Sequence, residues 1–320
     1  MANAQAPGSG PSIGIVMSDH IVAGVVSPEC KLTGELHKWP QSEDENEALL
    51  SMPSAAIVNQ LREEIQHVVK NGGVEQSNIA NIGLGLPGIV RDGVVEDSPN
   101  LVQLKGAHIA QMLAASLAEA GLHAPIRVNN DADVIAAGVA AAKGQLDQVV
   151  RVWTLGNGIG FGRYPAAHGV WEGGHMVVSL DSKETFCGCG GRGHLEGFCG
   201  YRAMRLRFMD REPEEIFAAA KPRDMKQGDA RCVEFVKMYH RALAAATASA
   251  IHMAGAGKFY FTGHAVEFLD MNTLKDYLHQ MVKMTPLQNY SLEVIADDSE
   301  LGVVGAAVAA MQAAKAGSPS

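Results

Sequence analysis

The stretch that decides the fold reads Glu172-Gly-Gly-His175 and then Cys187-Gly-Cys189-Gly-Gly-Arg-Gly-His194-Leu-Glu196. Two histidines and two cysteines form the ligand set of a closed tetrahedral zinc site, although their spacing is not that of a zinc finger. The glycines between them let the backbone turn tightly around a metal. We therefore predict a structural zinc held by His175, Cys187, Cys189 and His194. Such a site does not need Glu172 or Glu196, which are either solvated or directed at another ligand.

The same stretch resembles the signature of the ROK family, which contains sugar kinases and sugar-responsive repressors. That signature reads Glu-x-Gly-His and then Cys-Gly-Cys-Gly-x-x-Gly-Cys-x-Glu. His194 stands where the family usually has a third cysteine, and histidine is an equally good zinc ligand. The resemblance implies that His175 both binds zinc and helps to hold a sugar, and that Glu172 and Glu196 contact sugar hydroxyls.

The composition is that of a globular enzyme, with 47% hydrophobic and 19% charged residues among 320. A net charge of −9 argues against nucleic acid as a partner, and no room is left for an N-terminal DNA-binding helix-turn-helix. Five cysteines, two of them in the predicted zinc site, favour a cytoplasmic protein. No signal peptide or long apolar stretch indicates a membrane. We expect a small-molecule sugar as ligand and a homodimer or homotetramer as the assembly.

The order of patterns along the chain predicts a duplicated α/β fold, because a three-strand opening is followed by alternating helices and strands and the plan recurs. Residues 1–11 and 317–320 read as disordered tails. We place an N-terminal lobe at 12–125, joined by a C-terminal helix at 299–314, and a C-terminal lobe with the zinc loop at 126–298. The resemblance implies an actin-like, ribonuclease-H-like fold with the two lobes around a cleft.

Several polar residues match the sugar-binding side of the family. Gly88 ends a strand where backbone must approach a ligand, and Asn100 follows in a loop that resembles a sugar-contacting one. Asn130-Asp131 resembles the catalytic pair. An aspartate at a helix N-terminus is kept charged by the helix dipole and can accept a proton from a hydroxyl. Helix capping alone would explain this pair in isolation. With the signature residues also present in family order, we predict one sugar pocket and assign acid–base work to Asp131.

The nucleotide-binding side departs from the family. The first phosphate turn, Asp-x-Gly-Gly-Thr-Lys in the family, is replaced by Ile15-Val16-Met17-Ser18-Asp19-His20, which lacks the glycines that allow close backbone approach. The second turn survives as Gly156-Asn157-Gly158, a residual cofactor-binding element. His264 adds a ring where the purine would lie. On these residues we expect ATP and magnesium to be doubtful cofactors.

Three functions fit this asymmetry. The first is a sugar-acting enzyme that does not use ATP, cleaving a glycoside or isomerising a sugar with Asp131, Glu172 and Glu196 as catalytic groups. The second is a hexose or N-acetylhexosamine kinase with a divergent donor turn. The third is a sugar-binding regulatory protein without catalysis. We favour the first because the acceptor side is complete while the donor side is eroded.

Overall fold

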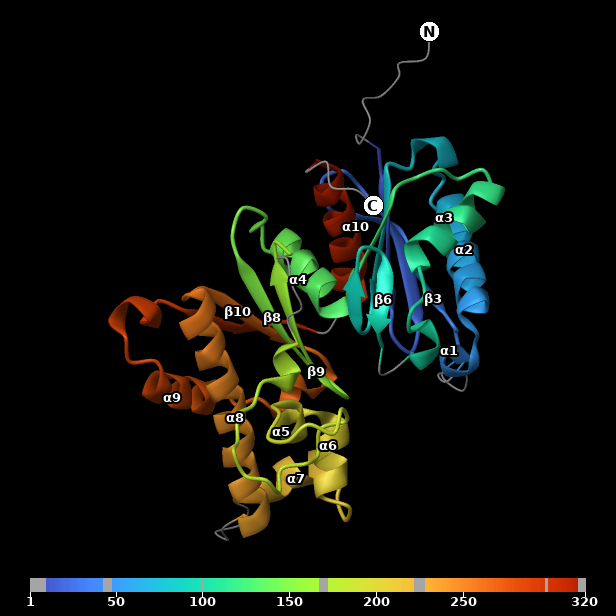
Figure 1. The fold of residues 1–320 in the computed structure, drawn as a ribbon. Coiled ribbons are helices and arrows are strands. Elements are labelled where there is room, and N and C mark those ends of the chain that lie inside the picture. The colour runs from blue at the N-terminus through green and yellow to red at the C-terminus, as the bar shows by residue number, and fades with distance from the viewer. Residues whose placement is uncertain are drawn as a thin grey trace. The chain divides into compact units, whose positions relative to one another are not determined.

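The structure, a computed structural model, describes residues 10–42, 48–98, 101–166, 172–221, 228–296 and 299–315. It divides into two compact units (Figure 1). The first comprises Met1–Val150, Gly162–Val170 and Asp298–Ser320, and the second comprises Arg151–Phe161 and Trp171–Asp297.

The first unit contains a five-stranded sheet in the order β3-β2-β1-β4-β7. β1 and β2 are antiparallel, as are β2 and β3, whereas β1 pairs with β4 and β4 with β7 in parallel. The strands are β1 (Ser12–Met17), β2 (Ile21–Val26), β3 (Leu32–Trp39), β4 (Asn81–Leu86) and β7 (Ile126–Asn130). A small hairpin, β5 (Ile89–Arg91) with β6 (Val94–Asp97), follows β4. The helices are α1 (Ala48–Ser51), α2 (Ser54–Asn71), α3 (Ile109–Glu119), α4 (Asp131–Ala142) and α10 (Ser299–Lys315).

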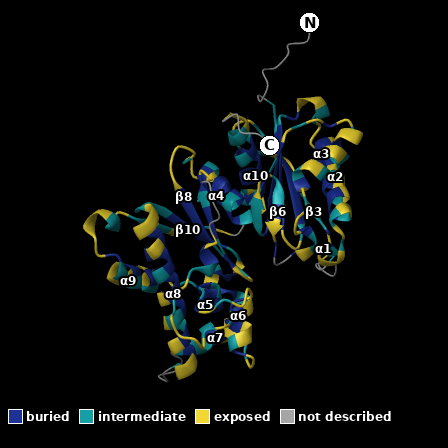
Figure 2. Cartoon of the chain, viewed as in Figure 1, coloured by how far each residue is buried: buried dark blue, intermediate teal, exposed yellow. Residues whose placement is uncertain are grey.

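The two faces of this sheet are packed in different ways because successive side chains alternate across it. Ile13 and Ile15 belong to a buried apolar cluster that includes residues of α2 and α3, and β1, β2 and β4 are almost entirely buried (Figure 2). The opposite face carries glycines under α10. A Cβ on Gly14 or on Gly83 would come within 1.8 Å of a backbone carbonyl oxygen of α10. Helix α10 therefore lies directly on the backbone of the sheet.

The boundary between the units lies later than the expected division at 125/126. Strand β7 pairs with β4, and α4 packs against α10, so both belong to the first unit, which continues to Val150. The expectation that a second lobe begins at Ile126 was wrong. A strand can pair in parallel with another strand that lies many residues earlier in the chain, and β7 pairs in this way with β4. Helix α10 lies in the first unit, to which Asp298–Ser320 belong.

The second unit contains a four-stranded sheet in the order β11-β10-β8-β9. Its strands are β8 (Val150–Leu155), β9 (Ile159–Tyr164), β10 (Lys258–Thr262) and β11 (Ser291–Val294). The first residue of β8 and the last three residues of β9 are counted with the first unit. Its helices are α5 (Glu196–Cys199), α6 (Tyr201–Arg207), α7 (Pro213–Ala220), α8 (Ala230–Ala254) and α9 (Met271–Met281). An apolar cluster that includes Trp153, Phe198, Phe235, Tyr239 and Phe259 forms its core. Among the described residues, no helix has the length and apolar character needed to cross a bilayer.

A buried histidine joins two helices of this core. His240 of α8 is 1% exposed. Its Nδ1 lies 2.8 Å from the carbonyl oxygen of Val236, and its Nε2 lies 2.8 Å from the backbone nitrogen of Asp270 at the start of α9. Nδ1 must therefore carry the proton, and Nε2 accepts from the Asp270 N–H. Burial lowers the pKa of His240 below its ordinary value, against the smaller opposing effects of Val236 and the Asp270 carboxylate.

We predict that protonation of His240 destabilises the protein in mild acid. The unfolded chain takes up this proton near pH 6.5, whereas the native state takes it up only at lower pH. The contribution of His240 is therefore complete above about pH 6.5 and is lost as the pH falls below that value, with a slope that approaches about 1.4 kcal/mol per pH unit. Thermal unfolding between pH 7.5 and pH 5 measures it.

The His240→Gln variant should be less stable at pH 7.5 and should lose less stability on acidification than the parent. His252, an exposed residue of the same helix, provides the control, since His252→Gln should leave the pH dependence unchanged. Parallel pH profiles for the parent and His240→Gln would contradict the prediction.

Candidate functional site

The four predicted zinc ligands meet in the second unit. The ligand atoms of His175, Cys187, Cys189 and His194 all lie within 4.8 Å of one another. The Sγ atoms of the two cysteines are 3.4 Å apart, Cys187 Sγ is 3.4 Å from His175 Nδ1, and Cys189 Sγ is 3.2 Å from His194 Nδ1. Tetrahedral zinc with ordinary bond lengths separates such atoms by roughly 3.5 to 3.8 Å. The donor set and its geometry therefore fit a single metal ion.

Local backbone features bring these ligands together. His175 lies in a single 3-10 turn, Gly173–His175, and Val177 forms an isolated β-bridge with His194. Gly193 has a φ of +68°, and a Cβ there would lie 1.9 Å from the carbonyl oxygen of Ser179. The glycines of the motif thus allow the chain to fold back on itself around the ligands.

Glu196 links the ligand cluster to the turn between β8 and β9. One carboxylate oxygen accepts a hydrogen bond from the Cys187 thiol at 3.3 Å, and the other accepts from the backbone N–H of Ile159 at 3.2 Å. Burial is the main reason why the pKa of the Cys187 thiol lies far above its ordinary value in the metal-free chain. Metal binding would remove that proton, because the thiolate is the ligand. Glu196 would then lose a donor and could accept from a ligand hydroxyl instead.

Glu172 lies beside the same cluster. Its Oε2 is 3.9 Å from Nε2 of His175, the ring nitrogen that is not directed at the cysteines. Burial raises the pKa of Glu172 above its ordinary value, His175 opposes this shift, and the charge of Glu196 adds to it. The two glutamates are therefore close enough to repel each other and both adjoin the predicted metal. Hydroxyl groups that donate to both would relieve this repulsion.

The turn Gly156-Asn157-Gly158 is closed by contacts within the second unit. The N–H of Gly156 donates to the carbonyl oxygen of Gly158 at 3.1 Å, and Tyr201 at the start of α6 donates its N–H to the carbonyl oxygen of Gly156 at 2.9 Å. A Cβ on Gly156 would meet the His264 ring at 3.3 Å. His264 therefore lies next to this turn, and its predicted place beside a purine stays a prediction.

The first unit holds the predicted catalytic pair at the carboxyl end of β7. The Asn130 side chain caps α4 by accepting from the N–H of Ala132 at 2.9 Å, and its Nδ2 donates to the carbonyl oxygen of Gly88 at 2.9 Å. Asp131 is the first residue of α4, is half-buried, and also accepts from the N–H of Ala132 at 2.8 Å. Asn130 thus caps α4 and in addition links the end of β7 to Gly88, which lies just after β4.

Gly88 itself is required by the local geometry. Its φ is +114°, and a Cβ there would lie 2.2 Å from the carbonyl oxygen of Asp97. Ser98 braces this turn, since its hydroxyl donates to the carbonyl oxygen of Pro87 at 2.8 Å and accepts from the N–H of Leu101. Ser98 was not among the predicted site residues, although a serine next to the loop that contains Asn100 was a signal. Asn100 lies outside the described residues, so its predicted role stays a prediction.

The first phosphate turn is replaced by a tight β1–β2 hairpin. The N–H of Ser18 donates to the carbonyl oxygen of His20 at 2.8 Å, so this backbone donor is already used. Asp19 Oδ1 accepts from the Ser18 hydroxyl at 2.7 Å and lies 3.0 Å from Nδ1 of His20. Burial would raise the pKa of Asp19, but hydrogen bonds from Ser18 and His20 outweigh it and leave the pKa below its ordinary value. A negative charge therefore stands at this turn.

The predicted sugar pocket joins residues of both units, and that convergence stays a prediction. Within the second unit the structure brings together Glu172, His175 and Glu196. Within the first unit it brings together Gly88, Asn130 and Asp131.

Comparison with known proteins establishes the family. The model of the ROK family matches residues 23–313, so the chain belongs to the ROK family. A glucokinase from Pyrobaculum calidifontis is 29% identical over 202 residues, which are 58% of this chain and 62% of that protein. The match thus spans about three fifths of this curated relative.

Two solved structures confirm the predicted duplicated actin-like α/β fold. A ROK hexokinase from Thermus thermophilus superposes with a TM-score of 0.75 at 22% identity, covering 96% of this chain and 99% of that one. A ROK glucokinase from Streptomyces griseus, in complex with glucose and AMPPNP, gives a TM-score of 0.66 at 22% identity, covering 95% and 100%. At this identity the likeness concerns the fold.

We predict that the purified protein contains one zinc per chain. Metal analysis should find it, and the Cys187→Ser, Cys189→Ser double variant should lose it, because two thiolates supply half of the ligands. Cys30 lies outside the cluster, so Cys30→Ser should retain the metal. Zinc retained at full stoichiometry in the double variant would contradict the assignment.

Proposed function

We propose that this chain is a sugar kinase that transfers the γ-phosphoryl group of ATP to a hydroxyl of a hexose-type sugar. The observation that carries the proposal is the fixed Asn130–Asp131 pair at the end of β7. Asn130 is held on both sides by Gly88 and Ala132, so the first residue of α4 has a defined position. Glucokinase and hexokinase relatives support this chemistry.

Asp131 would act as the base of the reaction. Its carboxylate lies in the first turn of α4, where the helix dipole stabilises a negative charge. It accepts the proton of the sugar hydroxyl while that oxygen forms a bond to the γ-phosphorus. The bond between this phosphorus and the β-bridging oxygen breaks, and ADP leaves with the electron pair. Asp131 would therefore position the sugar hydroxyl and accept its proton.

Glu172, His175 and Glu196 would bind the sugar. The metal supplies a fixed cross-link for the loop that carries them, and His175 would bind it through Nδ1 and present Nε2 to the sugar. Carboxylates accept strong hydrogen bonds from hydroxyls, and two adjacent carboxylates can grip neighbouring hydroxyls of a ring. Their arrangement suits binding of a neutral polyol.

The glycoside cleavage or isomerisation favoured on sequence grounds finds no support among the three relatives described above, which are named as kinases. The doubt about ATP is likewise unsupported, since the Streptomyces griseus glucokinase was solved with AMPPNP. We therefore adopt the kinase alternative. A sugar-binding regulator remains the second candidate, because the β1–β2 hairpin uses its own Ser18 donor and carries the Asp19 charge.

We predict that γ-labelled ATP with magnesium and a panel of hexoses and N-acetylhexosamines yields a labelled sugar phosphate. Asp131→Asn keeps the shape of the side chain and removes the base, so it should lower kcat by on the order of 10² or more. Sugar affinity, measured by calorimetry, should stay within a few-fold. Asp147→Asn, at an exposed position, is the matched control.

Sugar binding without label transfer from ATP would favour the regulator. Full activity of Asp131→Asn would remove this residue from the mechanism and direct the search for the base to Glu172 or Glu196.

We predict that the charge of Asp19 weakens ATP binding. Removal of one carboxylate near a triphosphate is worth about 1 kcal/mol at short range in water, so Asp19→Asn should tighten ATP binding roughly fivefold. The effect should shrink as salt is raised, because the charge is largely exposed. Calorimetry with magnesium and ATP at two ionic strengths measures it.

Asp276→Asn, an exposed substitution on α9, changes the net charge equally and should leave ATP affinity unchanged. Equal ATP affinities for the parent and Asp19→Asn would show that the hairpin does not face the nucleotide.

A further inference from the structure

Arg207 is the last residue of α6, and its side chain is only 13% exposed. It makes a bidentate ion pair with Glu184, whose side chain is 14% exposed, with Nη1 3.2 Å from Oε1 and Nη2 in contact with Oε2. The same Nη2 donates to the carbonyl oxygen of Gly197 at 3.0 Å. One guanidinium therefore joins the segment before the cysteine ligands to the residue directly after Glu196.

Aromatic rings enclose this guanidinium. Its carbon lies 4.1 Å from the centre of the Phe186 ring and 5.1 Å from that of Phe198. Phe186 directly precedes the ligand Cys187, and Phe198 lies in α5 two residues after Glu196. Stacking on rings and bidentate pairing are properties of arginine that lysine does not share.

The backbone of Glu184 extends the connection to a third ligand. Its carbonyl oxygen accepts a hydrogen bond of 2.8 Å from the N–H of Gly193, the residue before His194. Arg207 therefore contacts Phe186, which precedes Cys187, and Gly197, which follows Glu196. Through Glu184 it is also connected to Gly193, the residue before His194. These contacts all lie within the second unit.

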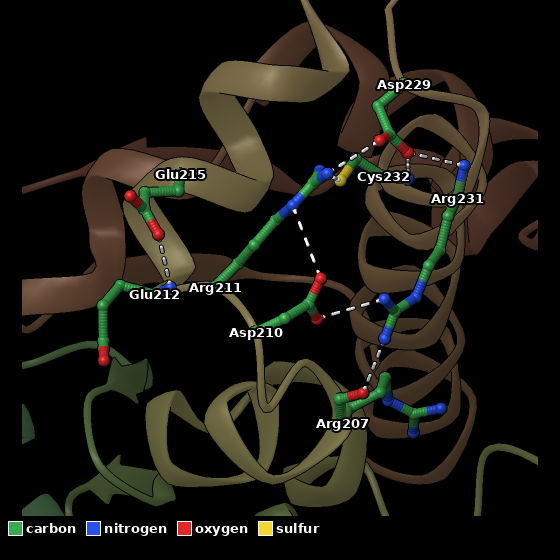
Figure 3. Close-up of polar contacts among 8 residues, drawn as sticks. All are labelled: Arg207, Asp210, Arg211, Glu212, Glu215, Asp229, Arg231 and Cys232. Atoms are coloured by element: carbon green, nitrogen blue, oxygen red, sulfur yellow. Dashed lines mark hydrogen bonds and ion pairs between the residues drawn. The ribbon is translucent and has the colours of Figure 1, made fainter.

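The neighbouring arginines have other partners. Figure 3 shows Arg211 paired with Asp229 and Asp210, and Arg231 paired with Asp210. Arg231 also donates to the carbonyl oxygen of Arg207 at 3.0 Å, which fixes the end of α6 against α8. In this view the guanidinium of Arg207 takes no part in the network drawn. The backbone at the end of α6 is therefore fixed to α8, whereas the side chain of Arg207 reaches the metal loop, which we define as residues 176–196.

We propose that Arg207, through Glu184 and Gly197, is a positioning residue that sets both the retention of the metal and the placement of Glu196 for the sugar. The proposal rests on the metal site and on the sugar-binding role of Glu196 given above. Metal ligands depend on partners outside the coordination shell, and the loss of such a partner costs about 10- to 100-fold in affinity. The metal loop needs such support because, among its described residues, it contains only an isolated bridge as regular pairing.

The test compares Arg207→Met, Arg207→Lys and Glu184→Gln with the parent chain. The rate of zinc release to a chromogenic chelator and the sugar dissociation constant from calorimetry are measured on folded protein. Arg207→Met and Glu184→Gln should release zinc about tenfold faster or more and should bind the sugar more weakly. Arg207→Lys should lie between, because it keeps the charge but cannot reach Glu184 and Gly197 together.

Arg211→Lys is the matched control, since Arg211 is paired in the same helical layer without contact with the metal loop, and it should release zinc at the parental rate. Parental zinc release in both Arg207→Met and Glu184→Gln, or equally fast release in Arg211→Lys, would overturn the proposal, as would a parent chain that binds no zinc. Neither readout requires turnover, so failure of the kinase assignment is a separate result.

Discussion

The convergence of four ligand side chains around one point is the constraint on which the sugar-binding side depends. Between Met176 and Leu195 the metal loop contains an isolated β-bridge but no helix or strand, so the hydrophobic core alone does not fix its path. The cluster of His175, Cys187, Cys189 and His194 supplies the missing restraint. Glu196 follows directly, and the Ile159 N–H holds one of its carboxylate oxygens, a contact that metal binding at Cys187 leaves in place. A zinc ion bound at the predicted site would therefore restrain the loop that leads to Glu196.

A different constraint positions Asp131 in the first unit. The backbone of α10 touches the sheet and α4 because glycines stand at the contacts. A Cβ on Gly138 of α4 would lie 1.8 Å from the carbonyl oxygen of Leu301, and a Cβ on Gly305 of α10 would lie 1.7 Å from that of Val134. Such contacts leave α4 little freedom to slide. The start of α4, and with it the Asn130–Asp131 pair, is consequently fixed by backbone packing more than by side-chain interdigitation.

Local sequence patterns predicted much of this arrangement. Ligand types and glycine spacing indicated the metal cluster, and Asn-Asn-Asp indicated the capped start of α4. The unit boundary was missed because the pairing of β7 with β4 joins segments more than forty residues apart and leaves no local trace. The contacts of Arg207 with Glu184 and Gly197 were not predicted, because an arginine at a helix end is ordinarily solvated. Helix α9 and strand β11 were also not anticipated, although the Asp270 cap was a usable signal.

The proposed function combines an acceptor side built around the predicted metal cluster with a β1–β2 hairpin that differs from the phosphate turn of the family. We infer that the metal cluster positions Glu172 and Glu196 to bind a sugar. Anomalous diffraction at the zinc edge, from crystals grown with zinc and a bound hexose, tests this inference. The account predicts one zinc bound by two sulfurs and two imidazole nitrogens of His175, Cys187, Cys189 and His194, with both glutamates on sugar hydroxyls. Zinc at any other position, or a sugar bound without either glutamate, would contradict it.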